Sequence, residues 1–193
     1  MRKNFLIFAV NGLAGSGKDT FVNIMSTFLS PDYRIRTIRL AKRLKKATSI
    51  IFDLGDLDLN NPESKEIIAT ENGLTVREVL QRLGTEVCRT IDPDTWINPV
   101  LRDIDRAYLD GIDIVFIPDL RFNNEYEKLK NYDYDIKFIK IIRPNLNISN
   151  FTLNHISEQE LSDVKWDKTF INDRSLKDFK NMIKDYILEL TLK

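Results

Sequence analysis

The chain has 193 residues, of which 42% are hydrophobic and 30% charged, so it is long and apolar enough for one α/β domain and is not disordered by composition. Lysine plus arginine and aspartate plus glutamate number 29 each, and this zero net charge argues against a surface that binds nucleic acid electrostatically. The single cysteine, Cys88, excludes an intramolecular disulfide and indicates a reducing, cytoplasmic compartment; with the single histidine, His155, it excludes a Cys/His zinc finger.

The first elements are marked by a change from apolar to glycine-rich sequence. Residues Phe5–Val10 form a continuous apolar run, which is typical of a parallel strand covered on both faces. Gly12–Gly17 interrupt this run, and a helical pattern follows. We expect a weaker second strand at Arg34–Leu40 and a basic helix at Ala41–Phe52.

The middle of the chain combines an acidic loop with a capped helix. Residues Leu54–Asn72 predict a loop that contains a short helical piece from Pro62 to Thr70. Thr75 and Glu78 have the spacing of a capping box, and apolar residues at helical spacing then predict a helix over Val76–Thr90.

Strands and helices alternate through the rest of the chain. Asp92–Pro93 predicts the start of a helix that continues to Leu109, and Ser175 caps a final amphipathic helix. Between them we expect strands at Ile112–Ile117, Ile136–Ile142 and Thr169–Ile171 and a helix at Asn123–Lys130. This alternation predicts an α/β fold of three layers, a mostly parallel sheet flanked by helices, in a single domain over residues 1–193.

The strongest motif lies between the first strand and the first helix. It matches the core of a phosphate-binding loop, in which glycines let backbone N–H groups surround a phosphate and a lysine adds an ammonium group. Asp19 stands where many such loops have serine or threonine, so its carboxylate must point away from the phosphates or hold magnesium through water. Thr20 is then the candidate hydroxyl near the metal, and a glycine-rich turn without a ligand is the alternative. The motif consists of Gly12, Leu13, Ala14, Gly15, Ser16, Gly17, Lys18, Asp19 and Thr20.

A second candidate site follows the strand predicted at Ile112–Ile117. Because ligands of parallel α/β sheets bind beyond the carboxyl ends of the strands, we expect Asp119 to face the phosphate loop. Asp119 can order magnesium-bound water, and Arg121 can stabilise the charge of a phosphoryl group during its transfer. An exposed ion pair in a strand-end turn is the alternative.

Two helices of the middle region carry candidates for a second anionic substrate. Most of their basic residues are expected on solvated faces, but Lys45 and Arg77 are candidates for phosphate contacts. Gln81 lies one turn after Arg77 and can hydrogen-bond the edge of a base. Trp96 either stacks on a base or belongs to the core. Cys88 is interpreted as a packing residue, and His155 as a loop residue.

In this order, the motifs resemble the phage-type deoxynucleoside monophosphate kinases, a branch of the P-loop nucleoside monophosphate kinase group. The resemblance extends over nearly the whole chain apart from Leu54–Asn72, and the branch itself has aspartate at the position of Asp19. It is carried by Gly15–Thr20, Leu40–Ala41 with Lys45, Val76–Arg77 with Gln81, Leu83–Thr85, Trp96, Ile117–Arg121 with Glu125, Ile142–Pro144, His155–Glu158, Ile171–Asp173 and Ser175–Leu176.

The resemblance implies transfer of the ATP γ-phosphoryl group to a deoxynucleoside monophosphate. Lys18 and the loop would hold ATP, with Mg²⁺ near Thr20 and Asp119, and Arg121 and Arg143 would clamp the transferred group. A lid is implied at about residues 144–162 and an acceptor-binding region at about 41–110. The acceptor would contact Lys45, Arg77, Gln81, Trp96 and Arg121, and the ATP base would lie at Asn172, Asp173 and Ser175.

Two other functions stay open at this stage. One is another small-molecule P-loop kinase, acting for example on phosphomevalonate or dephospho-coenzyme A. The other is a nucleotide-binding module without transferase activity. The expected partners are small nucleotides, with no nucleic acid and no membrane, and related kinases form homodimers.

Overall fold

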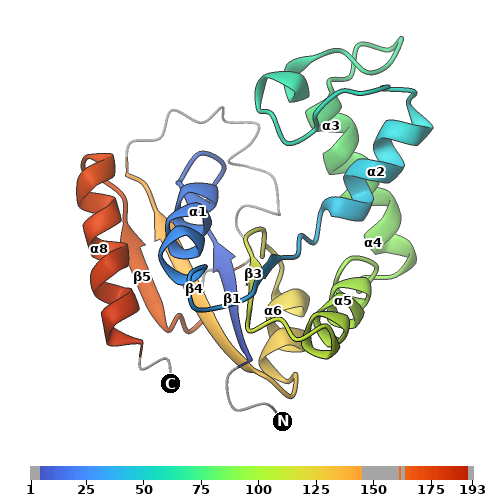
Figure 1. Ribbon diagram of the computed structural model, residues 1–193. Coiled ribbons are helices and arrows are strands. Elements are labelled where there is room, and N and C mark those ends of the chain that lie inside the picture. Colours follow the sequence, from blue (N-terminus) through green and yellow to red (C-terminus); the bar gives the residue numbers. More distant parts are fainter. Residues whose placement is uncertain (1–4, 145–160, 162–163, 191–193) are drawn as a thin grey trace. The chain divides into compact units, whose positions relative to one another are not determined.

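The computed structural model describes residues 5–144, 161 and 164–190, and the chain divides into two compact units. The first unit comprises residues 1–39 and 101–193, and the second comprises residues 40–100. Figure 1 shows the sheet of the first unit and the helices of the second. Within the described ranges, no helix has both the length and the apolar character that crossing a membrane requires.

A five-stranded parallel sheet forms the centre of the first unit, with the strand order β2-β3-β1-β4-β5. This order confirms the predicted α/β fold with a parallel sheet. Since every pair is parallel, all five carboxyl ends lie along one edge of the sheet. The strands are β1 (Leu6–Asn11), β2 (Ile35–Thr37), β3 (Ile114–Ile117), β4 (Asp135–Ile142) and β5 (Lys168–Ile171).

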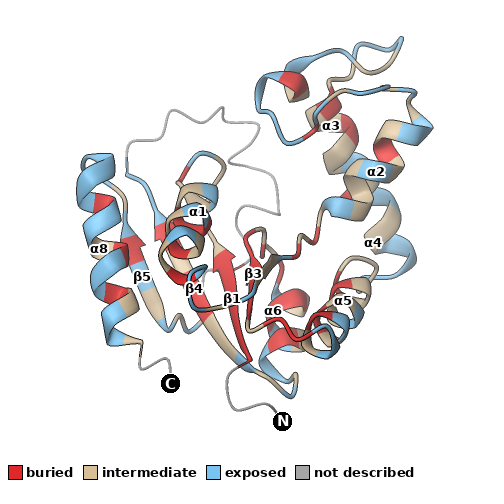
Figure 2. Cartoon of the chain, in the orientation of Figure 1, coloured by how far each residue is buried: buried red, intermediate tan, exposed pale blue. Residues whose placement is uncertain are grey.

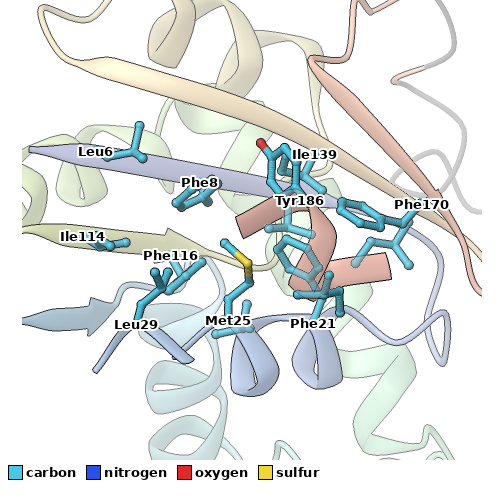
Figure 3. Close-up of a cluster of buried hydrophobic side chains, with 14 of the residues drawn as sticks. Leu6, Phe8, Phe21, Met25, Leu29, Ile114, Phe116, Ile139, Phe170 and Tyr186 are labelled. Atoms are coloured by element: carbon cyan, nitrogen blue, oxygen red, sulfur yellow. The ribbon is translucent and has the colours of Figure 1, made fainter. Parts of the chain in front are cut away.

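Helices cover both faces of this sheet, which explains the continuous apolar run in β1. Leu6, Phe8 and Val10 belong to one buried cluster with side chains of α1 (Lys18–Leu29) and α8 (Leu176–Glu189) (Figure 3). On the other face, α6 (Asn123–Lys130) packs Tyr126 against Phe138 of β4, with the ring centres 4.4 Å apart, and α5 (Ile97–Leu109) packs Tyr108 against Phe5. Figure 2 shows that β1 and β3 are buried along their lengths. Because helices cover both faces of the sheet, consecutive residues of these strands are buried, and their sequences do not alternate between polar and apolar residues.

The second unit is helical and contains an irregular winding. The capping box predicted at Thr75 and Glu78 is confirmed, with the Thr75 backbone N–H donating to Glu78 Oε2 at 2.8 Å. The two Thr75 donors lower the pKa of the Glu78 carboxyl. The elements are α2 (Lys42–Ile51), the 3₁₀ turn η1 (Glu63–Glu66), α3 (Val76–Gln81), the π-helical turn η2 (Arg82–Val87) and α4 (Cys88–Ile91).

The π-helical turn interrupts the helix that the sequence predicts as regular over Val76–Thr90. Wider winding displaces backbone carbonyls from their usual partners, and the carbonyl of Gly84 accepts a 2.9 Å hydrogen bond from the Trp96 indole. Gly84 is buried, and a Cβ atom there would lie 2.7 Å from a methyl group of Leu44 in α2. Helix α2 therefore packs directly against the backbone of the turn.

Two other predicted helices are shorter in the structure for local reasons. The helix expected from Asp92–Pro93 begins only at Ile97, because the Asp92 side chain accepts a hydrogen bond from the Asp94 N–H at 2.9 Å and holds a turn. The helical piece expected at Pro62–Thr70 is limited to η1, because Ile68 pairs with Thr75 in an isolated antiparallel bridge. The second strand is likewise limited to β2.

A tyrosine pair in the first unit should make stability depend on alkaline pH. Tyr132 and Tyr134 donate to the two carboxylate oxygens of Asp105, at 2.7 and 3.1 Å. Burial first and then Asp105 raise the pKa of Tyr134 to about 12, and raise that of Tyr132. A raised folded-state pKa gives a contribution that is complete below the unfolded value of about 10 and is lost as the pH rises through the folded value. We expect urea-unfolding free energies to fall from pH 10 to 12, and to fall less steeply in Tyr134→Phe; equal slopes would contradict the assignment.

Candidate active site

The phosphate-binding loop connects β1 to α1 and is shaped by two glycines with different constraints. Gly17 has a left-handed backbone, with φ 104°, and a Cβ atom there would lie 2.7 Å from the Asn172 amide nitrogen. At Gly12 a Cβ atom would lie 2.5 Å from the backbone oxygen of Ile141. The loop therefore requires glycine at both positions. Ser16 of the same loop is buried, and its hydroxyl has no hydrogen-bond partner among the described residues.

Lys18 folds back across this loop. Its ammonium group donates to the carbonyl oxygen of Leu13 at 2.7 Å and also to that of Gly12. The side chain is thus held over the loop from the first turn of α1, where the helix also presents the positive end of its dipole. An ammonium group and the start of a helix therefore meet at this loop, and both features favour the binding of a phosphate.

The turn after β3 is docked against the end of β1, and this places Asp119 next to the loop. The Asn11 amide donates to the Leu120 carbonyl at 2.9 Å, and the Leu120 N–H donates to the Val10 carbonyl at 3.2 Å. Asp119 directly precedes Leu120, which makes both of these hydrogen bonds, and is half-buried. Asn11 was not among the predicted site residues, because nothing in the sequence links it to a turn more than 100 residues away.

A buried carboxylate positions the backbone at Arg121. Glu125 is 2% exposed, and its Oε2 atom accepts hydrogen bonds from the N–H groups of Arg121, at 2.9 Å, and Phe122, at 3.1 Å. Glu125 occupies the third position of α6, where a carboxylate also interacts favourably with the helix dipole. The sequence did contain a signal for this role, because Glu125 stands three residues after Phe122, the residue directly before the helix. Glu125 was nevertheless not among the predicted site residues.

Removing this carboxylate should destabilise the protein. In Glu125→Ala, one buried and one part-buried N–H donor lose their acceptor, and we expect the free energy of unfolding to fall by about 3 kcal/mol. The matched control is Glu127→Ala in the same helix, since the exposed Glu127 side chain forms a 3.7 Å pair with Lys130 and should change stability by less than about 0.5 kcal/mol. Chemical denaturation of both variants measures the difference; similar values would refute the role of Glu125.

Four predicted residues follow β4 and β5 at the carboxyl edge of the sheet. Arg143, directly after β4, reaches the carbonyl of Gly15 with its Nη1 atom at 3.4 Å. The Asn172 amide, directly after β5, donates to the Ser16 carbonyl at 2.9 Å and so supports the loop. Ser175 caps α8, where its hydroxyl accepts from the Asp178 N–H at 3.2 Å. Asp173 lies 3.9 Å from the guanidinium of its neighbour Arg174.

In the second unit, the two predicted phosphate-binding cations are held by residues of the loop before α3. Lys45 donates to Asn60 Oδ1 at 2.7 Å, and Arg77 donates through Nε and Nη2 to one oxygen of Glu66, at 2.9 and 2.6 Å. Asn60 in turn donates to Asp58, and these bonds lower the pKa of the Asp58 carboxyl. The two cations are therefore oriented by polar side chains of this loop.

The predicted base-contacting residues lie on or beside the π-helical turn. Gln81 ends α3, and its Oε1 atom is buried without a hydrogen-bond partner among the described residues. The indole N–H of Trp96 is engaged by Gly84, as described above. His155 and nearly all of the expected lid at 144–162 lie outside the described residues. The roles assigned to all of these side chains stay predictions.

Comparison with known proteins identifies the family. The model of the deoxynucleotide monophosphate kinase family matches residues 54–183, a range that includes Asp119, Arg121 and Arg143 and follows the phosphate loop. A search of curated proteins gave no match.

Solved structures with similar folds include several kinases. Dephospho-CoA kinase from Campylobacter jejuni is 15% identical with a TM-score of 0.49, covering 96% of each chain. Shikimate kinase from Acinetobacter baumannii is 13% identical with a TM-score of 0.47, covering 99% of this chain and 97% of its own. Because the family model spans more than half of the sequence, the chain belongs to the deoxynucleotide monophosphate kinase family.

Proposed function

We propose that the protein transfers the γ-phosphoryl group of ATP to a deoxynucleoside 5′-monophosphate. An oxygen of the acceptor phosphate forms a bond to the γ-phosphorus as the bond to the β,γ-bridging oxygen breaks, giving the deoxynucleoside diphosphate and ADP. The observation that carries the proposal is the gathering of the phosphate loop, Lys18, Asp119 and Arg143 at the carboxyl edge of the sheet in a chain of this family.

The ATP-binding residues would all come from the first unit. Lys18 and the N–H groups of the loop would hold the β- and γ-phosphates, and Arg121 and Arg143 would stabilise the charge that spreads over the transferred group. Asn172, Asp173 and Ser175 would lie near the adenine. No covalent intermediate is required, because positioning and charge neutralisation supply the catalysis.

The donor atoms of this edge fit magnesium. Mg²⁺ prefers oxygen ligands and commonly takes one or two from the protein, with the rest from phosphates and water. Thr20, in the first turn of α1, offers a hydroxyl, and Asp119 offers a carboxylate from the turn docked on β1. When bound, the ion would neutralise phosphate charge. Thr20 and Asp119 would hold it, directly or through water.

The acceptor would bind in the second unit. We propose that Lys45 and Arg77 contact its phosphate, with Gln81 and Trp96 near its base, so that residues 41–110 serve as the acceptor-binding region. Residues 144–162 would form a lid that excludes water from the transfer.

A panel of acceptors tests the proposal. Purified protein is incubated with ATP and magnesium and one acceptor at a time: each of the four common deoxynucleoside monophosphates, the ribonucleotides, phosphomevalonate or dephospho-coenzyme A. We expect chromatography to show ADP and a nucleoside diphosphate from at least one deoxynucleotide. Turnover confined to phosphomevalonate or dephospho-coenzyme A would refute the substrate assignment. ATP binding without any transfer would indicate a binding module instead.

A further inference from the structure

The phosphate loop carries a negative charge at an unfavourable position. Asp19 directly follows Lys18 and lies in the first turn of α1, where the triphosphate of ATP would bind. Its side chain is 67% exposed. A carboxylate at this point repels an incoming polyphosphate and partly cancels the lysine next to it.

The structure pairs this carboxylate with a cation from a different part of the chain. Arg39 follows the carboxyl end of β2, and its Nη2 atom donates to Asp19 Oδ1 at 2.5 Å. The Arg39 side chain is 36% exposed. Because the two residues come from different elements, the pair brings a guanidinium from the end of β2 to the start of α1. Arg39 was not among the candidate residues, since a sequence separation of 20 gives no pattern that links it to the loop.

We infer that Arg39 neutralises Asp19 and thereby allows the loop to bind ATP; the inference rests on the proposed function. Arg39 acts here as a positioning and charge-balancing residue and does not touch the phosphates itself. The pair turns the Asp19 carboxylate toward the guanidinium and removes its net charge from the edge of the phosphate site. This assignment explains how a loop with aspartate at this position remains an anion-binding loop.

The inference predicts that the charges of Arg39 and Asp19 compensate each other. In Arg39→Gln, Asp19 is unopposed, and we expect the Kd for ATP to rise about 2- to 6-fold, the size expected when one or two phosphate charges lie about 8 Å from a unit charge in water. In Asp19→Asn, the unopposed arginine should lower the Kd by a similar factor. The double variant should bind ATP about as tightly as the unmodified protein. Both single effects should shrink as salt rises from about 0.05 to 0.5 M.

A second exposed ion pair, made by an arginine of β2, provides a matched control. Arg36 and Asp110 are 2.8 Å apart, with side chains 37% and 55% exposed, so the pair resembles Arg39–Asp19 in exposure. Arg36→Gln removes a cation three residues before Arg39 and should leave the Kd for ATP unchanged. Thermal denaturation of every variant separates a change in binding from a change in folding.

Isothermal titration with ATP distinguishes the outcomes. If the unmodified protein binds no ATP, the proposed function fails before the pair is tested. If ATP binds and Arg39→Gln behaves like Arg36→Gln, the inference is wrong while the proposed function stands. A loss of 100-fold or more in Arg39→Gln that Asp19→Asn does not rescue would also overturn it, because Arg39 would then bind phosphate directly.

Discussion

Replacing Arg121 by alanine should lower kcat on the order of 10³-fold while changing the Kd for ATP only modestly. Arg121 follows a turn that two hydrogen bonds anchor to the end of β1, and Glu125 accepts a hydrogen bond from its backbone N–H. In the proposed reaction, a cation on this fixed backbone would stabilise the charge of the transferred group with little reorganisation. Steady-state kinetics with the preferred deoxynucleotide, together with titration of ATP, measures both quantities.

Two further variants show whether the loss depends on the geometry of the guanidinium and on its place in the site. Arg121→Lys keeps the charge but loses the planar fork of donors, so it should recover only part of the lost rate. Arg106→Ala removes an arginine whose side chain is 72% exposed and pairs weakly with Asp103, at 3.7 Å, and should leave kcat unchanged. A change in Arg121→Ala that is confined to KM would show that this residue only docks the substrate.

Replacing Lys18 by methionine should lower kcat/KM by about 10²- to 10³-fold. The substitution keeps an unbranched side chain of similar length but removes the ammonium group that bonds the carbonyls of Gly12 and Leu13. In the proposed reaction, both the binding of the phosphates and the stabilisation of the transferred group would depend on that charge. The loss should therefore be divided between a higher KM for ATP and a lower kcat.

Lys180→Met in α8 is the matched control for this substitution. Lys180 is exposed, and its ammonium group lies 5.5 Å from the ring centre of Phe28. Its replacement should leave the kinetics unchanged. If Lys18→Met also retained full activity, the loop would not be the ATP site.

The elements that the sequence predicted best are those whose signals are local. The capping box at Thr75, the helix cap at Ser175 and the helix Asn123–Lys130 are all confirmed, because each depends on residues within a few positions of one another. The parallel sheet could be predicted as well, since continuous apolar runs alternate with helical patterns. The start of the helix at Ile97 could not, because the turn held by Asp92 competed with it.

The candidate site was predictable as a set of residues but not as a set of contacts. The phosphate loop and Asp119 follow from rules about strand ends, and the structure places them at one edge. The bonds that position them connect distant parts of the chain. Asn11 with Leu120 and Arg39 with Asp19 are examples, and neither residue type nor spacing identifies them.

The π-helical turn at Arg82–Val87 amounts to one extra residue wound into an otherwise regular helix. Deleting a single residue there would restore regular α-helical winding. Because the wide turn takes up the extra residue locally, such a deletion would rotate the preceding α3, with Arg77 and Gln81, relative to α4 by only a small fraction of the roughly 100° that one α-helical residue spans. What the deletion would remove is the displaced carbonyl of Gly84 that accepts the hydrogen bond from Trp96. The extra residue therefore serves the local winding of the turn and leaves the directions of Arg77 and Gln81 nearly unchanged.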